Sequence, residues 1–458
     1  MKTALKLADL QDTPSIESRL ASLGVNANSA QKRARQFALA ASGLQSQGTS
    51  ESEPVVAFCV PGRIEVLGKH TDYAGGHSVV CSVDRGFCIV AAAAADRTIT
   101  IQDVVSGDQV AFEFSPELQA TKGHWSNYPM TVARRVARNF GEPLRGANVA
   151  FGSDLPLASG LSSSSALIVG CFSVFAAIND LSSRPPYQQV ITDQLALAEY
   201  LGTTENGQSY RTFVGDRGVG TFGGSEDHTA ILCSEPGVLK CFAYAPTRFQ
   251  RQVRVPEGYA FVIGSSGVRA EKTGGAQQWY NDTATLAAEA AAVWRQATGR
   301  SDMNLGQAIA SPGFTVDRML AAIQRHENPE WAERLATRFQ HFYLEDQEII
   351  PSALDAMAAN DIPGFAEAVK QSQQGAEQLL GNQIDETIAL VRMALEAGAV
   401  AASAFGAGFG GSVWALTRED DAEALCRDWS EGYRRDFPHR HGESQFFISG
   451  RSPATMQL

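Results

Sequence analysis

The chain lacks long apolar runs, a secretion signal and clustered cysteines, and each absence excludes a class of protein. No stretch reaches the roughly 18 uninterrupted apolar residues that a membrane-spanning helix needs. Residues 1–10 carry two lysines but no apolar segment followed by a small-residue cleavage site. The seven cysteines are scattered and none forms a C-x-x-C pair, which is typical of reduced, buried thiols. We therefore expect a soluble, cytoplasmic protein.

Positive charge is scarce as well. The 458 residues contain 38 Lys and Arg against 50 Asp and Glu, so the formal net charge is −12. Nucleic acids and acidic membranes require clustered Lys and Arg, and we expect neither as a partner. Small phosphates are compatible with this charge because backbone amides can bind them. Hydrophobic residues make up 44% of the chain, enough for the core of three domains or of one large two-lobed enzyme.

The hydrophobic pattern predicts a mixed α+β protein in three segments. Residues 1–54 have the pattern of a polar helical lead-in and linker, residues 55–240 that of a first lobe that begins with strands, and residues 241–458 that of a second, mainly helical lobe. Residues 165–178 are apolar on nearly every side, which predicts a buried helix. A stripe of four apolar residues at helical spacing predicts another helix, formed by Ile384, Ile388, Val391 and Leu395.

The segment from Asp154 to Ala166 is the most informative part of the sequence. Pro156 and Gly160 predict a turn, and four consecutive serines follow it, with the buried helix starting at the last of them. A helix N-terminus presents unpaired N–H groups and partial positive charge, which together stabilise a bound di- or triphosphate. One serine would suffice as a helix N-cap, so the residues alone leave a cap and a phosphate site as alternatives.

Two other glycine-rich segments fail to match known nucleotide-binding motifs. Residues 62–70 have five residues between the glycines, where a Walker A loop has four, and His70 stands where that loop needs Ser or Thr. Residues 406–411 satisfy G-x-G-x-x-G but follow a helix and open a strand, the reverse of the dinucleotide-binding arrangement. We expect these glycines to let the backbone approach a ligand or a neighbouring helix closely.

Three segments, in order, resemble the motifs of the GHMP small-molecule kinases and, within them, of the galactokinases. Residues 61–75 (PGRIEVLGKHTDYAG) resemble the galactokinase signature, residues 155–166 the phosphate loop and residues 403–413 the third glycine-rich motif. Residues 125–128 (WSNY) also have a counterpart in that branch. The resemblance spans residues 55 to about 415 and implies a two-lobe α+β fold with the active site in the cleft between the lobes.

The resemblance implies sites for ATP and Mg²⁺. It places Trp125 beside the adenine, with a core tryptophan as the alternative. Ser164 matches a Mg²⁺-liganding serine, and Glu205 is the candidate second ligand, with a solvated glutamate at a helix end as its alternative. The implied ATP contacts are Trp125, Gly160, Leu161, Ser162, Ser163, Ser164 and Ser165.

The resemblance also implies the groups that carry the chemistry. Asp227 matches the catalytic aspartate, which either removes the proton of the sugar's anomeric hydroxyl or positions that hydroxyl. Glu226 departs from the usual methionine beside it and competes for this role. Arg63 matches an arginine beside the transferring phosphoryl group, where a guanidinium spreads charge over the oxygens. A surface ion pair is the alternative for Arg63.

Four residues match positions that contact the sugar: Lys69, His70, Asp72 and Tyr280. Asp72 can accept hydrogen bonds from two adjacent hydroxyls, whereas a satisfied core histidine is the alternative for His70. Lys69 replaces the glutamate of the galactokinases and so reverses the polarity of its subsite. Either a protein carboxylate such as Glu65 pairs with Lys69, which leaves a neutral sugar, or an acidic substrate such as a uronic acid does.

We therefore expect an ATP- and Mg²⁺-dependent kinase that phosphorylates the anomeric hydroxyl of galactose or a galactose-like sugar. The alternatives are a kinase for an acidic sugar, a kinase for a non-sugar alcohol such as mevalonate or homoserine, and a catalytically silent relative that binds sugar and ATP as a sensor. Retention of Arg63, Ser164 and Asp227 disfavours the sensor, and the segment His-Thr-Asp-Tyr favours a sugar. The exact sugar, the pathway and the oligomeric state stay open, a monomer included.

Overall fold

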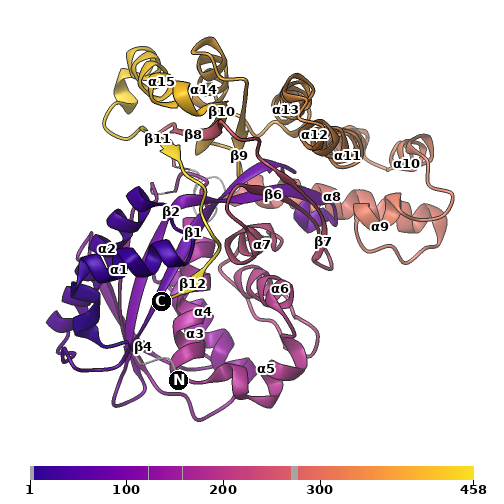
Figure 1. Ribbon diagram of the computed structural model, residues 1–458. Coiled ribbons are helices and arrows are strands. Elements are labelled where there is room, and N and C mark those ends of the chain that lie inside the picture. Colours follow the sequence, from indigo (N-terminus) through magenta and orange to yellow (C-terminus); the bar gives the residue numbers. More distant parts are fainter. Residues whose placement is uncertain (1–4, 122, 157, 270–276) are drawn as a thin grey trace.

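The computed structural model describes residues 5–121, 123–156, 158–269 and 277–458. The chain forms two lobes of mixed α+β structure, as the sequence predicts (Figure 1). The first lobe, at the bottom of that view, is built on an eight-stranded sheet, and the second, at the top, on a four-stranded sheet.

The first sheet collects strands from most of the length of the chain. Its main path is β12-β1-β2-β5-β3-β4, and β6 and β7 extend it from β2. The pair β3 and β5 is parallel, and the other pairs in this sheet are antiparallel. The strands are β1 (Val55–Leu67), β2 (His77–Ala93), β3 (Thr98–Asp103), β4 (Gln109–Glu113), β5 (Ala147–Ser153), β6 (Val238–Ala243), β7 (Arg248–Arg254) and β12 (Met456–Gln457).

Helices cover both faces of the long central strands. Successive side chains of a strand point to opposite faces, so Ala57 and Cys59 of β1 pack in one apolar cluster with α2, while Phe58 and Val60 pack in another with α4. The segment up to residue 46, expected as a lead-in, forms α1 and α2 and buries its apolar side on this sheet. The helices of this lobe are α1 (Thr13–Ser22), α2 (Ala27–Ser46), α3 (Asn127–Phe140), α4 (Ser163–Ile178), α5 (Pro185–Val190), α6 (Gln194–Asn206) and α7 (Glu226–Cys233).

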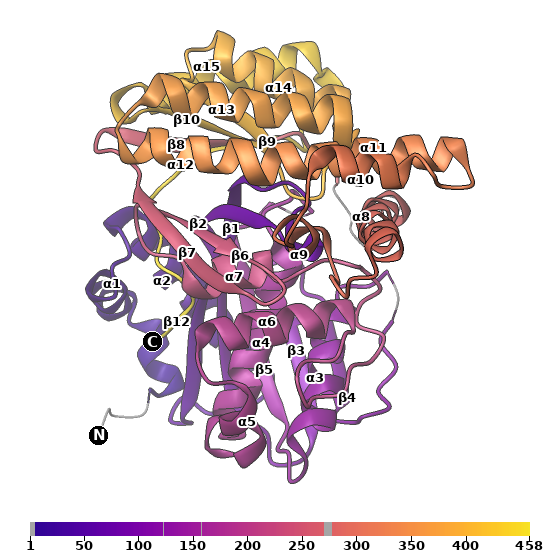
Figure 2. The same cartoon turned by 90° about the vertical axis from the view of Figure 1, so that its right-hand side faces the viewer.

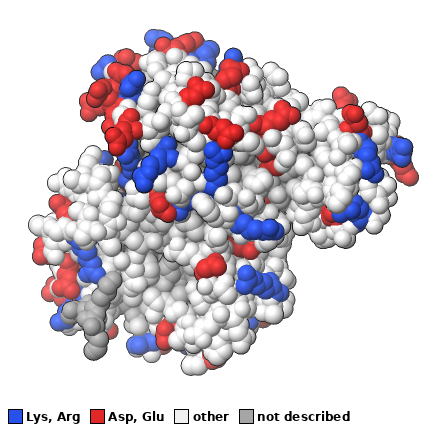
Figure 3. Space-filling view, turned by 45° about the vertical axis from the view of Figure 1, so that its right-hand side comes forward, with Lys and Arg blue, Asp and Glu red and all other residues white. Residues whose placement is uncertain are grey.

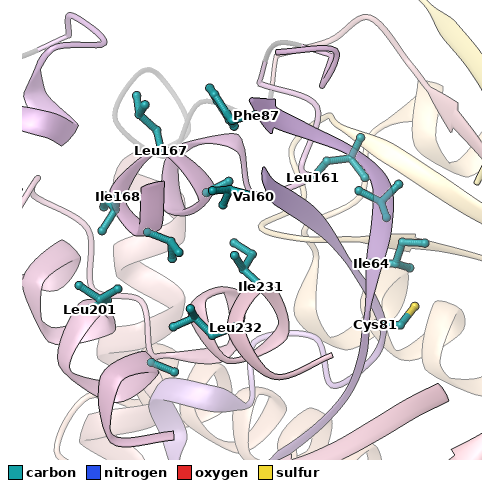
Figure 4. Packing of buried hydrophobic residues seen from close by; sticks show 14 of the residues in the cluster. Val60, Ile64, Cys81, Phe87, Leu161, Leu167, Ile168, Leu201, Ile231 and Leu232 are labelled. Atoms are coloured by element: carbon teal, nitrogen blue, oxygen red, sulfur yellow. The ribbon is translucent and has the colours of Figure 1, made fainter. Parts of the chain in front are cut away.

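Helix α4 occupies the middle of the core, as its apolar composition predicts. Figure 4 shows Leu167 and Ile168 of this helix among buried side chains of β1, α6 and α7. Gly170 allows the helix to approach β2, because a Cβ atom there would lie 2.1 Å from Ile89 Cδ1. The helix begins at Ser163, two residues earlier than predicted, so the serines stand at the start of a rigidly packed element.

The second lobe is a small antiparallel sheet covered by helices. Its strand order is β11-β8-β10-β9, and α12, α13 and α14 lie across the top of Figure 2. A π-helical segment (Leu344–Ile349) joins α11 to α12. The strands are β8 (Tyr259–Ser265), β9 (Ala401–Phe405), β10 (Ser412–Arg418) and β11 (Gln445–Ser449). The helices are α8 (Gln277–Thr298), α9 (Leu305–Ile309), α10 (Val316–Ile323), α11 (Pro329–Tyr343), α12 (Ile350–Ala358), α13 (Ile362–Gly375), α14 (Asp385–Glu396) and α15 (Ala422–Asp436).

Strand pairing shows where the chain passes from one lobe to the other. β6 pairs with β2 and β7 pairs with β6, so the first sheet continues to Arg254, beyond the boundary expected at residue 240. β8 opens the second sheet at Tyr259. We propose a boundary within residues 255–258, with the chain returning to the first lobe at β12.

The predicted apolar stripe of residues 384–395 is only partly correct. α14 forms as predicted, but Ile388 and Leu395 are 39% and 44% exposed. Val391 of the predicted stripe is buried, together with Leu390 and Ala394 from outside it. The prediction used the large apolar residues alone. The helix instead packs a neighbouring stripe against the sheet, and that stripe includes the small residue Ala394.

The surface carries both signs of charge. On the face shown in Figure 3, Lys and Arg side chains gather where the upper lobe meets the lower one, and Asp and Glu cluster on the upper lobe. None of the described helices is both long enough and apolar enough to cross a membrane. All seven cysteines lie in the described ranges, and each is a free thiol.

Candidate active site

Two cavities meet at the base of the second lobe. The larger, about 520 Å³, extends from Trp125 past Ser162, Ser163 and Ser164 of the phosphate loop. The smaller is lined by side chains from both lobes, among them Asp227 of α7. Arg63 lines both cavities and so stands at their junction. Adjoining cavities of this kind suit a reaction between two bound molecules.

Strand β1 carries Arg63 into this junction. The side chain is 2% exposed; its Nη2 lies 2.7 Å from Asp227 Oδ1, and its Nη1 donates to the carbonyl of Gly160. Burial alone would lower the pKa of this guanidinium, but the carboxylates of Asp227, Glu226 and Glu65 raise the pKa above its ordinary value. Arg63 is therefore a permanent, buried cation and not a surface ion-pair arginine.

Helix α7 presents Asp227 in its first turn, where the helix dipole favours a negative charge. The hydroxyl of Ser165, fully buried at the start of α4, lies 3.2 Å from Asp227 Oδ2 and 2.8 Å from Glu205 Oε2. His228 Nε2 lies 3.2 Å from the same oxygen of Glu205. Glu205 is thus a buried member of the site, not a solvated glutamate at the end of α6.

A pair of carboxyl groups lies on the other side of Arg63. Glu65 follows Arg63 by two residues on β1, so both side chains leave the same face of the strand. Glu65 and Glu226 are each 4% exposed and interact with each other, and Glu226 Oε1 lies 3.5 Å from Arg63 Nε. Burial and the neighbouring carboxyl group raise the pKa of Glu226 well above its ordinary value, and burial raises the pKa of Glu65. The pair therefore retains a proton at a pH where isolated carboxyl groups have lost theirs.

Asp72 lies in a short turn (Asp72–Ala74) after β1. Its Oδ2 accepts a hydrogen bond from the backbone N–H of Glu226 at 3.3 Å, and its Oδ1 accepts one from the backbone N–H of Tyr73 at 2.8 Å. Glycine is required at position 224, because a Cβ atom on Gly224 would lie 2.4 Å from Asp72 Oδ2. This close approach fixes the Asp72 carboxylate on the wall of the smaller cavity.

His70 and Tyr280 complete this wall. His70 Nδ1 lies 2.7 Å from the Tyr73 hydroxyl and Nε2 lies 3.0 Å from the carbonyl of Ala407, so Nε2 carries a proton. The His70 ring lies against Tyr280 of α8, with ring centroids 5.2 Å apart. Both ring nitrogens of His70 have protein partners, as in the core alternative, although the ring still lines the cavity. Burial raises the pKa of Tyr280 well above its ordinary value, so this hydroxyl stays protonated.

The phosphate loop leaves donors unused at the start of α4. Ser162 is the N-cap residue, but it adopts a left-handed backbone with φ of 59° and its side chain makes no capping bond. In the described part of the chain its Oγ has no hydrogen-bond partner, although the residue is only 6% exposed. An unpartnered hydroxyl beside free backbone N–H groups favours an anion here over a simple cap. Position 157 of this loop lies outside the described residues.

Trp125 stands on the wall of the larger cavity and is partly exposed. Its ring packs edge-on against Phe151, with centroids 5.7 Å apart. Its Nε1 has no hydrogen-bond partner among the residues that the structure describes. This position favours contact with a planar ligand over a purely core role.

The structure places the Lys69 ammonium away from the smaller cavity, where the resemblance implies a substrate contact. The side chain is 1% exposed and is absent from the described lining of the smaller cavity; Nζ donates to the hydroxyls of Ser372 and Ser403, at 2.8 Å each. Ser372 in turn donates to Glu345 Oε1 at 2.9 Å, and the N–H of Gly68 donates to the same oxygen at 2.8 Å. Lys69 is turned into the second lobe because polar groups there satisfy its ammonium.

The residues present fit a divalent cation beside Glu205. Carboxylate and hydroxyl oxygens are the ligands that Mg²⁺ prefers. The hydroxyl against Glu205 belongs to Ser165, whereas Ser164, the predicted Mg²⁺ ligand, lines the larger cavity. Consecutive residues of a helix point about 100° apart, which separates the two serines. Within the described ranges no three acidic, His or Cys side chains form a metal-binding group, so a cation here needs further ligands from phosphate or water.

Most of the predicted site residues come together around the two cavities, and Lys69 does not. Sequence reasoning left Glu65 out of the site and did not single out Ser165 as the neighbour of Glu205. The alternation of a strand could have identified Glu65, since it lies two positions from Arg63. The partners of Lys69 gave no signal, because Ser403 lies 334 residues further along the chain.

Three family models match the chain in order. The galactokinase galactose-binding signature matches residues 47–93, which include β1, β2 and the turn at Asp72. The N-terminal domain of GHMP kinases matches residues 127–207, which include the phosphate loop and α4. The C-terminal domain of GHMP kinases matches residues 353–435, in the second lobe.

Galactokinases are among the relatives of this chain. The galactokinase of Chloroflexus aggregans is 28% identical over 375 residues, which cover 81% of this chain and 86% of the relative. The galactokinase of Roseiflexus sp. is 27% identical over 391 residues, which cover 83% of this chain and 88% of the relative. The fold is similar to that of Lactococcus lactis galactokinase complexed with galactose, with a TM-score of 0.72, 23% identity and coverage of 91% and 99%. It is less similar to a Methanococcus jannaschii mevalonate kinase, with a TM-score of 0.53, 12% identity and coverage of 88% and 100%. By these matches the chain carries the N- and C-terminal domains of GHMP kinases and the galactose-binding signature of galactokinases, on a galactokinase-like fold.

Proposed function

We propose that the protein is a galactokinase-like enzyme that transfers the γ-phosphoryl group of ATP to the anomeric hydroxyl of galactose or a galactose-like sugar. The observation that carries this proposal is the position of Arg63. Its guanidinium contacts Asp227, on the smaller cavity, and Gly160, in the phosphate loop. One cation therefore reaches both reactants at the point where a phosphoryl group would pass between them. The galactokinase relatives support the same reaction.

Each cavity has a role in this proposal. ATP occupies the larger, with its adenine beside Trp125 and its phosphates at the N-terminus of α4. The sugar occupies the smaller, against Asp72 and Tyr280. Asp227 accepts the proton of the anomeric hydroxyl or positions that hydroxyl, and with a loose transition state positioning contributes much of the rate. Arg63 stabilises the charge on the phosphoryl oxygens.

Magnesium belongs to the proposal through Glu205 and a serine of the phosphate loop. The ion would neutralise charge on the phosphate oxygens. Glu205 is held for this purpose by Ser165 and His228, which both approach its Oε2. The seven free thiols suit a reducing compartment, and we place the enzyme in the cytoplasm.

A neutral sugar fits the smaller cavity better than an acidic one. Besides Arg63 and two histidines, the described lining of this cavity carries five carboxyl groups, those of Glu65, Asp72, Glu205, Glu226 and Asp227. A uronate would add a further negative charge among them. Lys69, the cation that motivated an acidic substrate, is satisfied elsewhere.

The test is an ADP-release assay with galactose on the wild type and on Asp227→Asn. We expect kcat to fall about 10²–10⁴-fold, the usual contribution of a general base, with ATP binding within a few-fold of the wild type. Asp317→Asn, at an exposed position in the first turn of α10, is the matched control and should behave as the wild type. A variant that keeps more than about a tenth of kcat would move the catalytic role to another carboxylate, first of all Glu226. A wild type that binds sugar and ATP without releasing ADP would favour the sensor.

A further inference from the structure

A groove of about 470 Å³ lies between the lobes and shares no lining residue with the two cavities of the site. Helix α2 and strand β2 supply one side from the first lobe, and α15 and β11 supply the other from the second. In Figure 1 this is the left side of the molecule, where α2 lies below α15. A molecule bound here would touch both lobes.

Positive charge is concentrated in this groove, although the chain as a whole carries a net charge of −12. Three acidic side chains face five cationic ones across it. Both lobes contribute cations, which are Lys32, Arg33, Arg85, Arg427 and Arg434. Like charges brought together from two lobes repel each other unless an anion lies between them.

The protein leaves most of this charge unpaired. In the described ranges no carboxylate forms an ion pair with Lys32, Arg33, Arg85 or Arg434. Arg33 donates to the backbone carbonyl of Asp84 and to the Cys59 sulfur, and Arg85 donates to the backbone carbonyl of Asp154 and to the side-chain oxygen of Gln445. The Nε atoms of Arg33 and Arg434 have no hydrogen-bond partner in the described part of the chain. Burial lowers the pKa of Arg85 more than the nearby carboxylates of Asp154 and Asp84 raise it.

Two of these arginines, one from each lobe, pack against aromatic rings. Cζ of Arg85 lies 3.6 Å from the ring centroid of Phe447, and Cζ of Arg434 lies 5.9 Å from that of Phe446. Both approach the Cys426 thiol: burial raises the pKa of Cys426, and the two guanidinium groups act in the opposite direction. Planar guanidinium groups fixed in this way match the oxygens of a phosphate group.

We propose that this groove binds a small phosphorylated molecule whose phosphate group bridges Arg85 of the first lobe and Arg434 of the second. The volume suits a sugar phosphate or a nucleoside monophosphate, and the acidic character of the rest of the chain does not suit a polyanion. Asp154, which lines the groove, directly precedes the phosphate loop. The ligand thus ties the two lobes together next to the loop that binds ATP.

Calorimetric titration with glucose 6-phosphate, and separately with inorganic phosphate, tests the proposal. A non-hydrolysable ATP analogue, Mg²⁺ and galactose are present throughout, so that the catalytic cavities are filled, and NaCl holds the ionic strength constant. We expect saturable binding to the wild type and at least about tenfold weaker binding to Arg434→Gln. Arg392→Gln, which removes an exposed guanidinium paired with Glu396, is the control and should bind as the wild type does.

Arg85→Gln tests the same bridge from the other lobe and should weaken binding to a similar extent. Binding that survives in both variants, or wild-type protein that shows no saturable binding at millimolar phosphate, overturns the proposal. Because the readout is binding with the catalytic cavities occupied, either result leaves the ADP-release test of the proposed function unaffected.

Discussion

Glu226 combines deep burial, a neighbouring carboxyl group and contact with Arg63, so its affinity for a proton depends on folding. Its pKa in the folded protein is raised well above 4.5, the ordinary value, by burial and by the charge of Glu65. Above pH 4.5 the unfolded chain therefore holds fewer protons at this position than the folded protein does. The contribution of Glu226 to the free energy of unfolding is fully present below pH 4.5. It is lost as the pH rises through the folded-state pKa.

We predict that Glu226→Gln makes the free energy of unfolding less dependent on pH. The amide keeps the shape of the carboxyl group and can donate an N–H to Glu65, but it does not ionise. The change should remove up to about 1.4 kcal/mol per pH unit of slope between mildly acidic and mildly alkaline pH. Urea unfolding across that range measures it, with Glu348→Gln, at an exposed position, as the control. Parallel curves for the wild type and Glu226→Gln would show that this carboxyl group titrates normally.

A second prediction at this scale concerns two adjacent serines. Ser165 donates to Glu205, whereas Ser164 faces the larger cavity. Ser165→Ala should raise the Mg²⁺ concentration needed for half-maximal rate by about tenfold or more, because it loosens the proposed ligand. Ser164→Ala should change that concentration less. The reverse order, from rates measured over a Mg²⁺ titration, would support Ser164 as the ligand, as predicted from the sequence.

At the scale of elements, Lys69 ties the loop after β1 to α13 and β9 of the second lobe. Ser372 and Ser403 accept hydrogen bonds from its ammonium group, and the Ser372 hydroxyl donates one to the buried Glu345 carboxylate. The same loop carries His70 and Asp72, so the network helps to hold the proposed sugar ligands in place.

We predict that Lys69→Met lowers the free energy of unfolding by about 1–3 kcal/mol, because it leaves buried polar groups without a partner. The ratio of kcat/KM for galactose to that for galacturonate should not change, since the ammonium does not line the smaller cavity. Lys370→Met, on the exposed side of α13, is the control. If the wild type favours galacturonate clearly more than Lys69→Met does, Lys69 contacts the sugar after all.

At the scale of the whole molecule, the chain crosses between the lobes more than once. After β11 in the second sheet it returns to the first, where Ser452 accepts a hydrogen bond from Ser82, β12 pairs with β1, and Leu458 packs in the apolar cluster under α2. The last strand thereby fastens the second lobe to the edge of the first sheet.

Deletion of residues 455–458 should lower the free energy of unfolding by about 3 kcal/mol. The estimate combines the burial of Leu458 with the loss of the backbone hydrogen bonds from Thr455 to Ile231 and from Leu458 to Ala57. Urea unfolding measures the change, and the exposed substitution Gln457→Ala should leave stability as in the wild type. A deletion without effect would mean that β12 contributes nothing to holding the lobes together.

Local patterns in the sequence predicted strands at the start of the first lobe, the buried helix at the four serines, and three segments that resemble GHMP kinase motifs. Each depends on residues that are close along the chain: apolar, β-branched residues in β1, continuous apolar character in α4, and glycine and serine placed at a turn. These patterns were enough to predict the α+β class and the phosphate loop, and the resemblance to the GHMP kinases implied the roles proposed for Arg63, Asp72 and Asp227.

Tertiary structure alone decided which side of a helix or strand faces the core, the site or the solvent. It selected Ser165 rather than Ser164 as the neighbour of Glu205, brought Glu226 against Glu65, and turned Ile388 of α14 to solvent. It also directed Lys69 to Ser403, a residue 334 positions away. The physical reason is the same in each case: a polar or charged side chain takes the orientation that satisfies it when buried, and the groups that satisfy it come from distant parts of the chain.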